Sequence, residues 1–241
     1  MLNEFAKRAV TMGYTKTILC LANSRKPPDG RCIAGRELNG TGFDTWIRPV
    51  SARPTRELSL RERRYHDGGD PSLLDVISIE MTGPQPWNHQ QENHLIDVSR
   101  RWVKRGAMTW QGLQSAVEDV VGPLWLNGNS SYHGQNDRVA EDRIGEFTRS
   151  LYLIRTQRLR LVVATEDDLP PRRRVRAQFE YCGHFYRLPV TDPFIEDSLL
   201  ARDDVEIRVS EAILCVSLGE PFHGFAYKLA AAVMTPKRAG A

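Results

Sequence analysis

The sequence predicts a mainly β protein with a minor helical part, organised as two small β systems. Short apolar and β-branched runs recur through residues 14–82 and again through residues 151–234, often with the two-residue alternation that is typical of strands. Segments that contain glycine, proline and asparagine separate these runs, as tight turns require. The middle of the chain, residues 83–150, contains polar loops and two segments with helical spacing.

The first β system begins with three expected strands, over residues 17–21, 31–34 and 45–50. Residues 23–30, NSRKPPDG, are expected to form the first loop, because proline lacks an amide donor and glycine tolerates positive φ. A second loop spans residues 39–42. These loops would leave the polar and basic side chains of the first one in water beside the sheet.

Trp46 and Arg48 alternate with Ile47 in the third expected strand, so they are predicted to share the face opposite Ile47. A ring and a guanidinium on one open face would suit an anionic ligand with stackable rings. Two other interpretations stay open at this point. Trp46 is compatible with a core position, and Arg48 with a place at the sheet rim or a pair with Asp44.

Positive charge is concentrated in the first part of the chain. Residues 1–64 hold thirteen Lys or Arg against six Asp or Glu, whereas the whole chain has a net charge of +3. Residues 65–150 have the opposite bias, with seven basic against twelve acidic side chains. An anion-binding face is therefore expected to be local.

Several longer motifs stand out along the chain: CLANSRK at 20–26, GRCIAG at 30–35, WIRPVS at 46–51, GPLWLNGNSSYHGQNDRV at 122–139 and LCVSLGEPFHGFAYKLAAAV at 214–233. Together they resemble the bacterial family of dual OB-containing domain proteins. The resemblance extends over roughly residues 14–234 and implies two OB-like β-barrels. It implies nucleic-acid or nucleotide binding only by analogy, since a fold does not fix a function. No catalytic residues follow from it.

The resulting domain prediction is an N-terminal OB-like barrel with a helical insert at 14–150 and a C-terminal OB-like barrel at 151–234. Residues 1–13 and 235–241 are expected to be flexible termini. The insert would consist of helices over 97–105 and 109–121, with Asp97 and Thr109 as N-caps.

The second β system is expected to start with short strands at 152–155 and 158–164. A hairpin over 172–182 and 184–190 follows, then a helix at 192–201 capped by Asp192, and central strands at 213–218 and 226–233. Arg174 and Arg176 lie on one side of the hairpin's alternating pattern. They are interpreted as either a solvated barrel wall or a rail that tracks a nucleic-acid backbone.

Residues 122–138 contain almost no apolar matter to bury, so a surface loop held by its own hydrogen bonds is predicted. The loop combines donors, a ring and a fixed charge in Asn129, Ser130, Ser131, Tyr132, His133 and Arg138. It is interpreted either as part of an anion-binding surface or as an ordered Ω-loop without a ligand.

The cysteine and histidine patterns predict neither a metal site nor a cofactor. The four cysteines show no C-x-x-C spacing, so buried reduced thiols are expected rather than zinc ligands. His89 and His94 are five positions apart in a polar loop, without the spacing of a helical metal motif. No apolar run is long enough for a membrane span and the N-terminus lacks a secretory signal, so a cytoplasmic protein without membrane contact is expected.

The leading functional hypothesis is binding of single-stranded or structured DNA or RNA through a basic and aromatic surface. The candidate binding residues are Asn23, Ser24, Arg25, Lys26, Arg31, Trp46, Arg48, Asn129, Ser130, Ser131, Tyr132, His133 and Arg138. One alternative is a sensor or interaction subunit of a bacterial defence-type system, which binds a nucleotide or acts with a separate effector protein. Another is a phosphodiester-cleaving enzyme, although no recognised catalytic motif is present.

Overall fold

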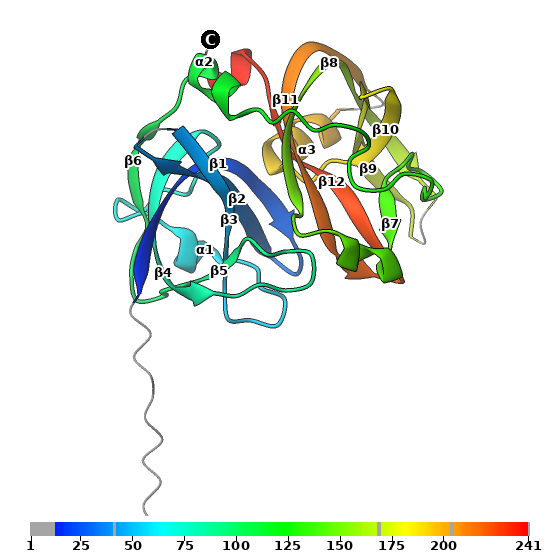
Figure 1. The fold of residues 1–241 in the computed structure, drawn as a ribbon. Coiled ribbons are helices and arrows are strands. Elements are labelled where there is room, and N and C mark those ends of the chain that lie inside the picture. The colour runs from blue at the N-terminus through cyan, green and yellow to red at the C-terminus, as the bar shows by residue number, and fades with distance from the viewer. Residues whose placement is uncertain (1–12, 41, 168–169, 203–204, 241) are drawn as a thin grey trace, which may run out of the picture.

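The computed structural model describes residues 13–40, 42–167, 170–202 and 205–240. Within them the protein is mainly β, with two six-stranded sheets that lie side by side (Figure 1). The flexible N-terminus that the sequence predicts falls almost entirely on residues 1–12, outside the described residues. No helix in the described part of the chain is long and apolar enough to cross a membrane.

The first sheet closes into a barrel. Its strands are β1 (Tyr14–Lys26), β2 (Gly30–Asn39), β3 (Gly42–Val50), β4 (Asp75–Pro84), β5 (Asn93–Ile96) and β6 (Val103–Ala107). The order is β1-β2-β3-β5-β4-β6, and β1 also pairs with β4, so β6 is an extra strand outside the closed ring. Strands β3 and β5 are parallel, and the short helix α1 (Leu60–Arg63) lies between β3 and β4 in the sequence.

The second sheet repeats this arrangement. It consists of β7 (Arg138–Ala140), β8 (Leu151–Glu166), β9 (Arg172–Tyr181), β10 (His184–Pro189), β11 (Glu206–Phe222) and β12 (Phe225–Met234), in the order β10-β9-β8-β11-β12-β7. A parallel bridge between Val190 and Ala230 connects the end of β10 to β12. Helix α3 (Pro193–Leu200) follows β10, as α1 follows β3. Both sheets thus have the strand order of five-stranded OB barrels.

Three apolar clusters hold the molecule together. One fills the first barrel and includes Ile18, Ile47 and Ile77. Another fills the second barrel, where the ring of Phe179 stacks on that of Tyr186. The third cluster, which we call the joint, lies between the barrels and contains the following buried residues: Leu19, Leu21, Ala22, Ala34, Trp46, Leu74, Leu113, Ala116, Leu151, Leu153, Ile213, Cys215, Ala231, Ala232 and Met234. The two barrels therefore pack wall against wall.

The prediction of two helices in the insert is largely wrong. Instead of a helix over 97–105, the chain forms strand β6, in which Val103 pairs with Ser78 of β4. Trp102 explains the difference, because its side chain is buried in the core of the first barrel and its backbone forms a bridge with Tyr65. The expected helix over 109–121 is only α2 (Trp110–Leu113) and the 3-10 helix η1 (Gln114–Ala116). Its N-cap is as predicted, since Thr109 Oγ1 accepts a hydrogen bond from the amide of Gly112.

The strand predictions are mostly confirmed, with longer boundaries. Strand β1 continues to Lys26, so the expected first loop is reduced to a turn at residues 27–29. The two short strands expected near residue 155 are one continuous strand, β8. The hairpin of β9 and β10 and the helix capped by Asp192 are present as predicted. The remaining elements are the 3-10 helices η2 (Glu141–Glu146) and η3 (Lys237–Ala239).

Candidate nucleic-acid site between the barrels

A cavity of about 750 Å³ lies between the two barrels. We call it the inter-barrel cavity. Its first wall is the end of the β1–β2 hairpin with Arg48 of β3. Its second wall comes from β9, β11, β12, the segment after β10, α3 and residues 131–133. The volume falls within the range of roughly 300–1,000 Å³ that is common for small-molecule sites.

More than half of the residues that the sequence singles out for binding meet in this cavity. They are Ser24, Arg25, Lys26, Arg48, Ser131, Tyr132 and His133. The first four come from the first barrel and the other three from the loop that precedes β7. The fold thus joins two polar segments that the sequence shows only as separate motifs.

The loop at 122–138 is held by internal hydrogen bonds and also by contacts with the second barrel. The prediction of a surface loop with almost no apolar matter to bury is wrong for Leu124 and Trp125, which are buried in the core of the second barrel. The buried carboxylate of Asp137 accepts hydrogen bonds from the amide of Ser131 at 2.7 Å and from its hydroxyl at 2.5 Å. The amide of Asn136 donates to Ser130 Oγ at 2.9 Å. A Cβ atom at Gly134 would lie 1.8 Å from Asp137 Oδ2, so the turn around this carboxylate requires glycine.

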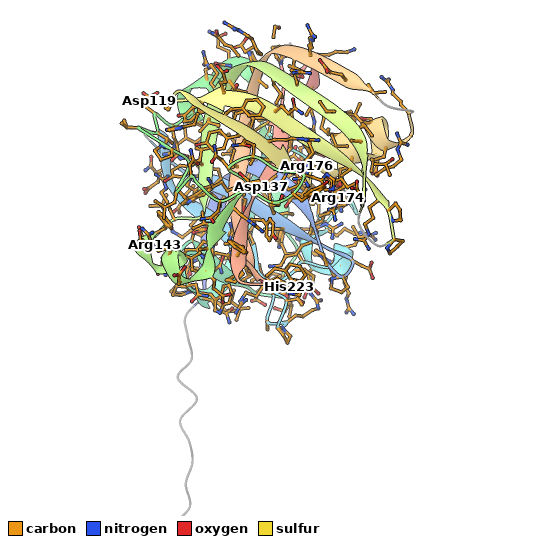
Figure 2. All side chains as sticks on the ribbon, turned by 90° about the vertical axis from the view of Figure 1, so that its right-hand side faces the viewer. Asp119, Asp137, Arg143, Arg174, Arg176 and His223 are labelled. Atoms are coloured by element: carbon orange, nitrogen blue, oxygen red, sulfur yellow. The ribbon has the colours of Figure 1, made fainter. Side chains whose placement is uncertain are left out.

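A buried network of charges forms one wall of the cavity. Arg176 donates to both carboxylate oxygens of Glu166, at 2.7 and 3.1 Å, and lies 3.4 Å from Asp137 Oδ2. Arg174 pairs with Glu166 at 3.1 Å. Figure 2 shows Arg174, Arg176 and Asp137 close together in the middle of one face. Arg176 does not lie on a solvated wall, because its side chain is buried. The alternation of β9 alone gave no sign that this side would be covered.

The two basic side chains at the end of β1 are already paired with acids of the second barrel. Lys26 Nζ lies 2.6 Å from Glu220. Arg25 donates to Glu196 at 2.9 Å and also pairs with Asp197. In addition, the amide of Arg25 donates to the carbonyl of Thr191 at 2.8 Å. These contacts fix the hairpin against the second barrel and neutralise part of its charge.

Arg48 is a buried part of the cavity wall. Its side chain is only 2% exposed. Nη2 donates to Ser150 Oγ at 2.7 Å and lies 3.1 Å from Glu92, whereas Nε and Nη1 have no hydrogen-bond partner among the described residues. Burial lowers the pKa of Arg48, but the Glu92 carboxylate together with smaller contributions from Cys32, Cys215 and Glu220 outweighs it, so the pKa is raised and the guanidinium stays charged. Two donors remain for an acceptor.

The exposed platform expected at Trp46 and Arg48 is absent. Trp46 is only 6% exposed, packs in the joint and donates from Nε1 to Glu118 at 3.1 Å. Both residues do point away from Ile47, which lies inside the first barrel. The second barrel covers their face. The prediction that the indole and guanidinium lie on an open surface is therefore wrong, and Arg48 pairs with Glu92 rather than with Asp44.

The remaining predicted residues lie elsewhere. Asn129 is exposed and does not line the cavity. The guanidinium of Arg138 lies over the ring of Phe225, 3.9 Å from its centroid. Asn23 and Arg31 line a second cavity, of about 510 Å³. The structure therefore divides most of the predicted binding set between two cavities and leaves Trp46, Asn129, Ser130 and Arg138 outside both.

Two exposed rings line the inter-barrel cavity. Tyr132 is 88% exposed and Phe222 is 64% exposed. Each ring forms an edge-to-face contact with the histidine that follows it, His133 and His223 respectively. The sequence indicates that Phe222 faces solvent, but not that the β11–β12 turn brings it to the same cavity as Tyr132. The sequence signal that could have identified Phe222 as a binding residue is an apolar ring placed in a tight turn.

No catalytic constellation is apparent in the residues that the structure describes. His89 is buried and contacts the carbonyl of Leu218 at 3.1 Å, and His94 contacts Tyr14 Oη at 2.6 Å. Both imidazoles of the polar loop thus have structural contacts, and burial lowers the pKa of each. No group of three or more His, Cys, Asp or Glu side chains in this part of the chain is arranged to hold a metal ion.

A family model described as "dual OB-containing domain" matches residues 16–233. No curated protein and no solved structure matches the chain. The matched region contains all strands of both barrels except the first residues of β1 and the last residue of β12. The chain therefore belongs to the dual OB-containing domain family.

Proposed function

We propose that this protein binds nucleic acid, and that the inter-barrel cavity receives a short unpaired segment of it. One observation carries the proposal: two exposed rings, Tyr132 and Phe222, line the same cavity as a buried guanidinium, Arg48, that has two unpaired donors. Stacking rings beside cationic groups are the combination that sequence-tolerant binding of single strands uses.

The exposed rings support an unpaired ligand. Bases in a duplex already stack on their neighbours, whereas an unpaired base can stack on a protein ring. Two rings at one cavity would accommodate one base each. A segment of a few nucleotides is therefore the size of ligand that fits.

The charges support few phosphate contacts. The described lining contains five basic side chains, Arg25, Lys26, Arg48, Arg174 and Arg176. It also contains four acidic ones, Asp137, Glu166, Glu196 and Glu220. Since most of these groups are paired with each other, each phosphate competes with a protein carboxylate. One or two phosphate contacts on a single strand correspond to a salt slope of about 0.7–1.4 in log K against log salt concentration.

A second candidate is a mononucleotide, because the cavity volume of about 750 Å³ is that of a small-molecule site. In this case the protein would act as a sensor that passes the signal to a separate effector protein, as in a bacterial defence-type system. The two candidates differ in how affinity depends on length. If the ligand is a strand, longer oligonucleotides are expected to bind more tightly than short ones. If the ligand is a mononucleotide, added nucleotides are expected to bring no gain in affinity.

The test is a titration of single-stranded oligonucleotides of increasing length, the matching duplexes and single nucleotides, with DNA and RNA versions of each. Replacement of Tyr132 or Phe222 by Ala is expected to cost about 1–3 kcal/mol of binding free energy per stacked base. Phe185→Ala is the matched control, since Phe185 is also an exposed ring, 44% exposed, but does not line the cavity.

Unchanged affinity for every ligand in both ring variants would refute the proposed site. Equal loss in Phe185→Ala would show that exposed rings contribute without regard to the cavity. Binding of single nucleotides with full affinity, and no gain from longer strands, would favour the mononucleotide.

A further inference from the structure

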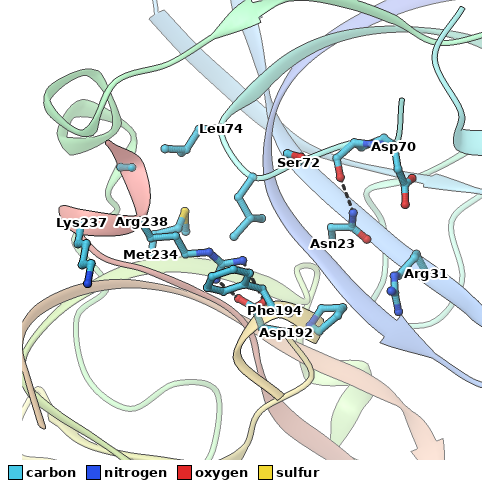
Figure 3. Close-up of a pocket in the computed structure, with 14 residues that line it drawn as sticks. Asn23, Arg31, Asp70, Ser72, Leu74, Asp192, Phe194, Met234, Lys237 and Arg238 are labelled. Atoms are coloured by element: carbon cyan, nitrogen blue, oxygen red, sulfur yellow. Dashed lines mark hydrogen bonds and ion pairs between the residues drawn. The ribbon is translucent and has the colours of Figure 1, made fainter. Parts of the chain in front are cut away.

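A second cavity, of about 510 Å³, lies between the barrels and does not share its lining with the inter-barrel cavity. We call it the Arg31 cavity. Asn23, Arg31 and residues 70–74 contribute from the first barrel, and the start of α3, Met234 and residues 237–239 from the second (Figure 3).

Both carboxylates in its wall are already paired. Asp70 accepts two hydrogen bonds from Arg63, at 2.6 and 2.9 Å. Asp192 accepts from the amide of Phe194 at 3.1 Å and from that of Val233 at 3.0 Å, and it also pairs with Arg238. The acidic groups of this cavity are therefore engaged with partners other than Arg31.

Arg31 lies in the wall of this cavity without a direct side-chain contact to a carboxylate among the described residues. Its guanidinium has no hydrogen bond or ion pair with any residue that the structure describes, although its backbone pairs with Leu58. Arg25 lies opposite Arg31 in the β1–β2 hairpin. Burial, and then the neighbouring Arg25 and Arg63, lower the pKa of Arg31, and the weaker attraction of the Asp70 and Asp197 carboxylates opposes this only in part. A partly buried cation that nearby carboxylates compensate only in part is a position that an anion would stabilise.

Two further groups in the cavity are available to contact a ligand. Asn23 Nδ2 donates to the carbonyl of Pro71 at 2.6 Å, but Asn23 Oδ1 is buried without a donor. The ring of Phe194 is 61% exposed, and the guanidinium of Arg238 lies 4.6 Å from its centroid. Figure 3 shows Phe194 between Arg238 on one side and Arg31 with Asn23 on the other.

We propose that the Arg31 cavity is a separate binding site for a phosphorylated small molecule with a planar ring. Arg31 would bind the phosphate, because its guanidinium is partly buried and has no ion pair among the described residues, whereas Lys237, which also lines the cavity, is exposed. Phe194 would contact the ring of the ligand, and Asn23 Oδ1 would accept a hydrogen bond from it. This site does not depend on the function proposed for the inter-barrel cavity, since no residue lines both.

The test uses AMP, adenosine and inorganic phosphate as probes, with calorimetry for affinity and amide chemical shifts for location. AMP is expected to bind more tightly than adenosine or phosphate and to shift the amides around Arg31 and Phe194. Arg31→Gln is expected to weaken AMP binding roughly tenfold to a hundredfold, the loss of a charge-assisted contact. Adenosine binding is expected to stay the same.

Arg64→Gln is the matched control, because Arg64 is an exposed arginine of the first barrel that does not line the cavity. Phe194→Leu keeps an apolar side chain and removes the ring, so it is expected to weaken AMP and adenosine binding alike. Thermal unfolding of each variant verifies the fold.

Three results would overturn the proposal: no binding of AMP or phosphate to the intact protein, equal AMP affinity in Arg31→Gln and the unchanged protein, or equal loss in Arg64→Gln. If Tyr132→Ala abolishes AMP binding and Arg31→Gln does not, AMP binds at the inter-barrel cavity instead. That result would refute this site and support the function proposed above. Loss of oligonucleotide binding in Tyr132→Ala, with AMP binding kept, would support two separate sites.

Discussion

The two barrels have the same strand order but differ in how firmly their last seam is closed. In the first barrel, β3 and β5 are joined by three parallel residue pairs, from Arg48 with Asn93 to Val50 with Leu95. In the second barrel, the equivalent seam between β10 and β12 has the single bridge from Val190 to Ala230. Val190 and Leu229 at this looser seam line the inter-barrel cavity. The comparison indicates that the seam of the first barrel is closed by more backbone pairs, whereas the seam of the second barrel with fewer pairs borders the cavity.

The largest expected effect is at the seam of the first barrel. Glu92→Ala would leave the buried Arg48 without its carboxylate and remove the partner of Ser150, so the free energy of unfolding is expected to fall by about 3–5 kcal/mol. Urea unfolding measures this change. The exposed pair of Arg143 and Glu146 provides the control, since Glu146→Ala is expected to leave stability unchanged. A small loss in Glu92→Ala would mean that water or a ligand compensates Arg48.

A pair of glycine variants comes next and compares the barrels directly. A Cβ atom at Gly35 would lie 2.0 Å from the backbone carbonyl oxygen of Leu19, so Gly35→Ala forces β1 and β2 apart and is expected to cost about 1–3 kcal/mol or more. At Gly134 the clash is with the side chain of Asp137. Gly134→Ala is expected to cost less stability but to displace residues 131–133 and weaken ligand binding. The reverse ranking would show that the backbone contact between β1 and β2 matters less for stability than the turn around Asp137.

The third prediction concerns a buried lysine of β12. Lys228 donates to the carbonyl of Leu126 at 2.7 Å and to Asn127 Oδ1 at 2.9 Å, and burial lowers its pKa to about 7, partly opposed by Asp137. The unfolded chain, with an ordinary lysine pKa of about 10.4, binds this proton more tightly than the native state. Stability is therefore expected to rise with pH between about 7 and 10, by up to about 1.4 kcal/mol per pH unit.

Lys228→Met removes this titration, so urea unfolding across that pH range compares the two proteins. The difference between their free energies of unfolding is expected to change with pH in the stated direction. Parallel curves for the two proteins would show that Lys228 keeps its proton in the native state.

The smallest expected effect is on the salt dependence of binding. Lys26→Ala is expected to reduce the salt slope by at most about 0.7, the value for one phosphate contact on a single strand, because Glu220 already competes for this lysine. Lys16→Ala is the matched control, since Lys16 forms a similar pair with Glu37 outside the cavity. An equal change in both variants would indicate a general charge effect rather than a phosphate contact.

Local sequence patterns predict the strands well and the surfaces poorly. Alternation correctly places Trp46 and Arg48 opposite Ile47, but which side of a strand is covered depends on a barrel more than a hundred residues away. The same limit applies to Arg176, whose outward side is closed by Glu166 and Asp137. The alternation of apolar and polar residues along one strand does not show whether a distant part of the chain covers its polar side.

The misread segments have a related cause. The spacing of Trp102 and Val103 fits a helix and a strand equally, and pairing with β4 decides between them. The loop at 122–138 was recognisable from its glycine and amide residues, and part of its hydrogen bonding is internal. The burial of Leu124 and Trp125 in the second barrel was not predicted. The places of Phe222 and Arg31 in their cavities could not be predicted, because they depend on residues that are distant in the sequence.

The joint has a practical consequence for experiments on this chain. Leu19, Leu21 and Trp46 of the first barrel lie against Leu153 and Ile213 of the second. A truncated protein with one barrel would expose this apolar wall to water, together with the unpaired acids and bases of the cavity. Isolated halves are therefore expected to aggregate rather than to report on binding, and the intact chain is the smallest unit in which either ligand should be sought.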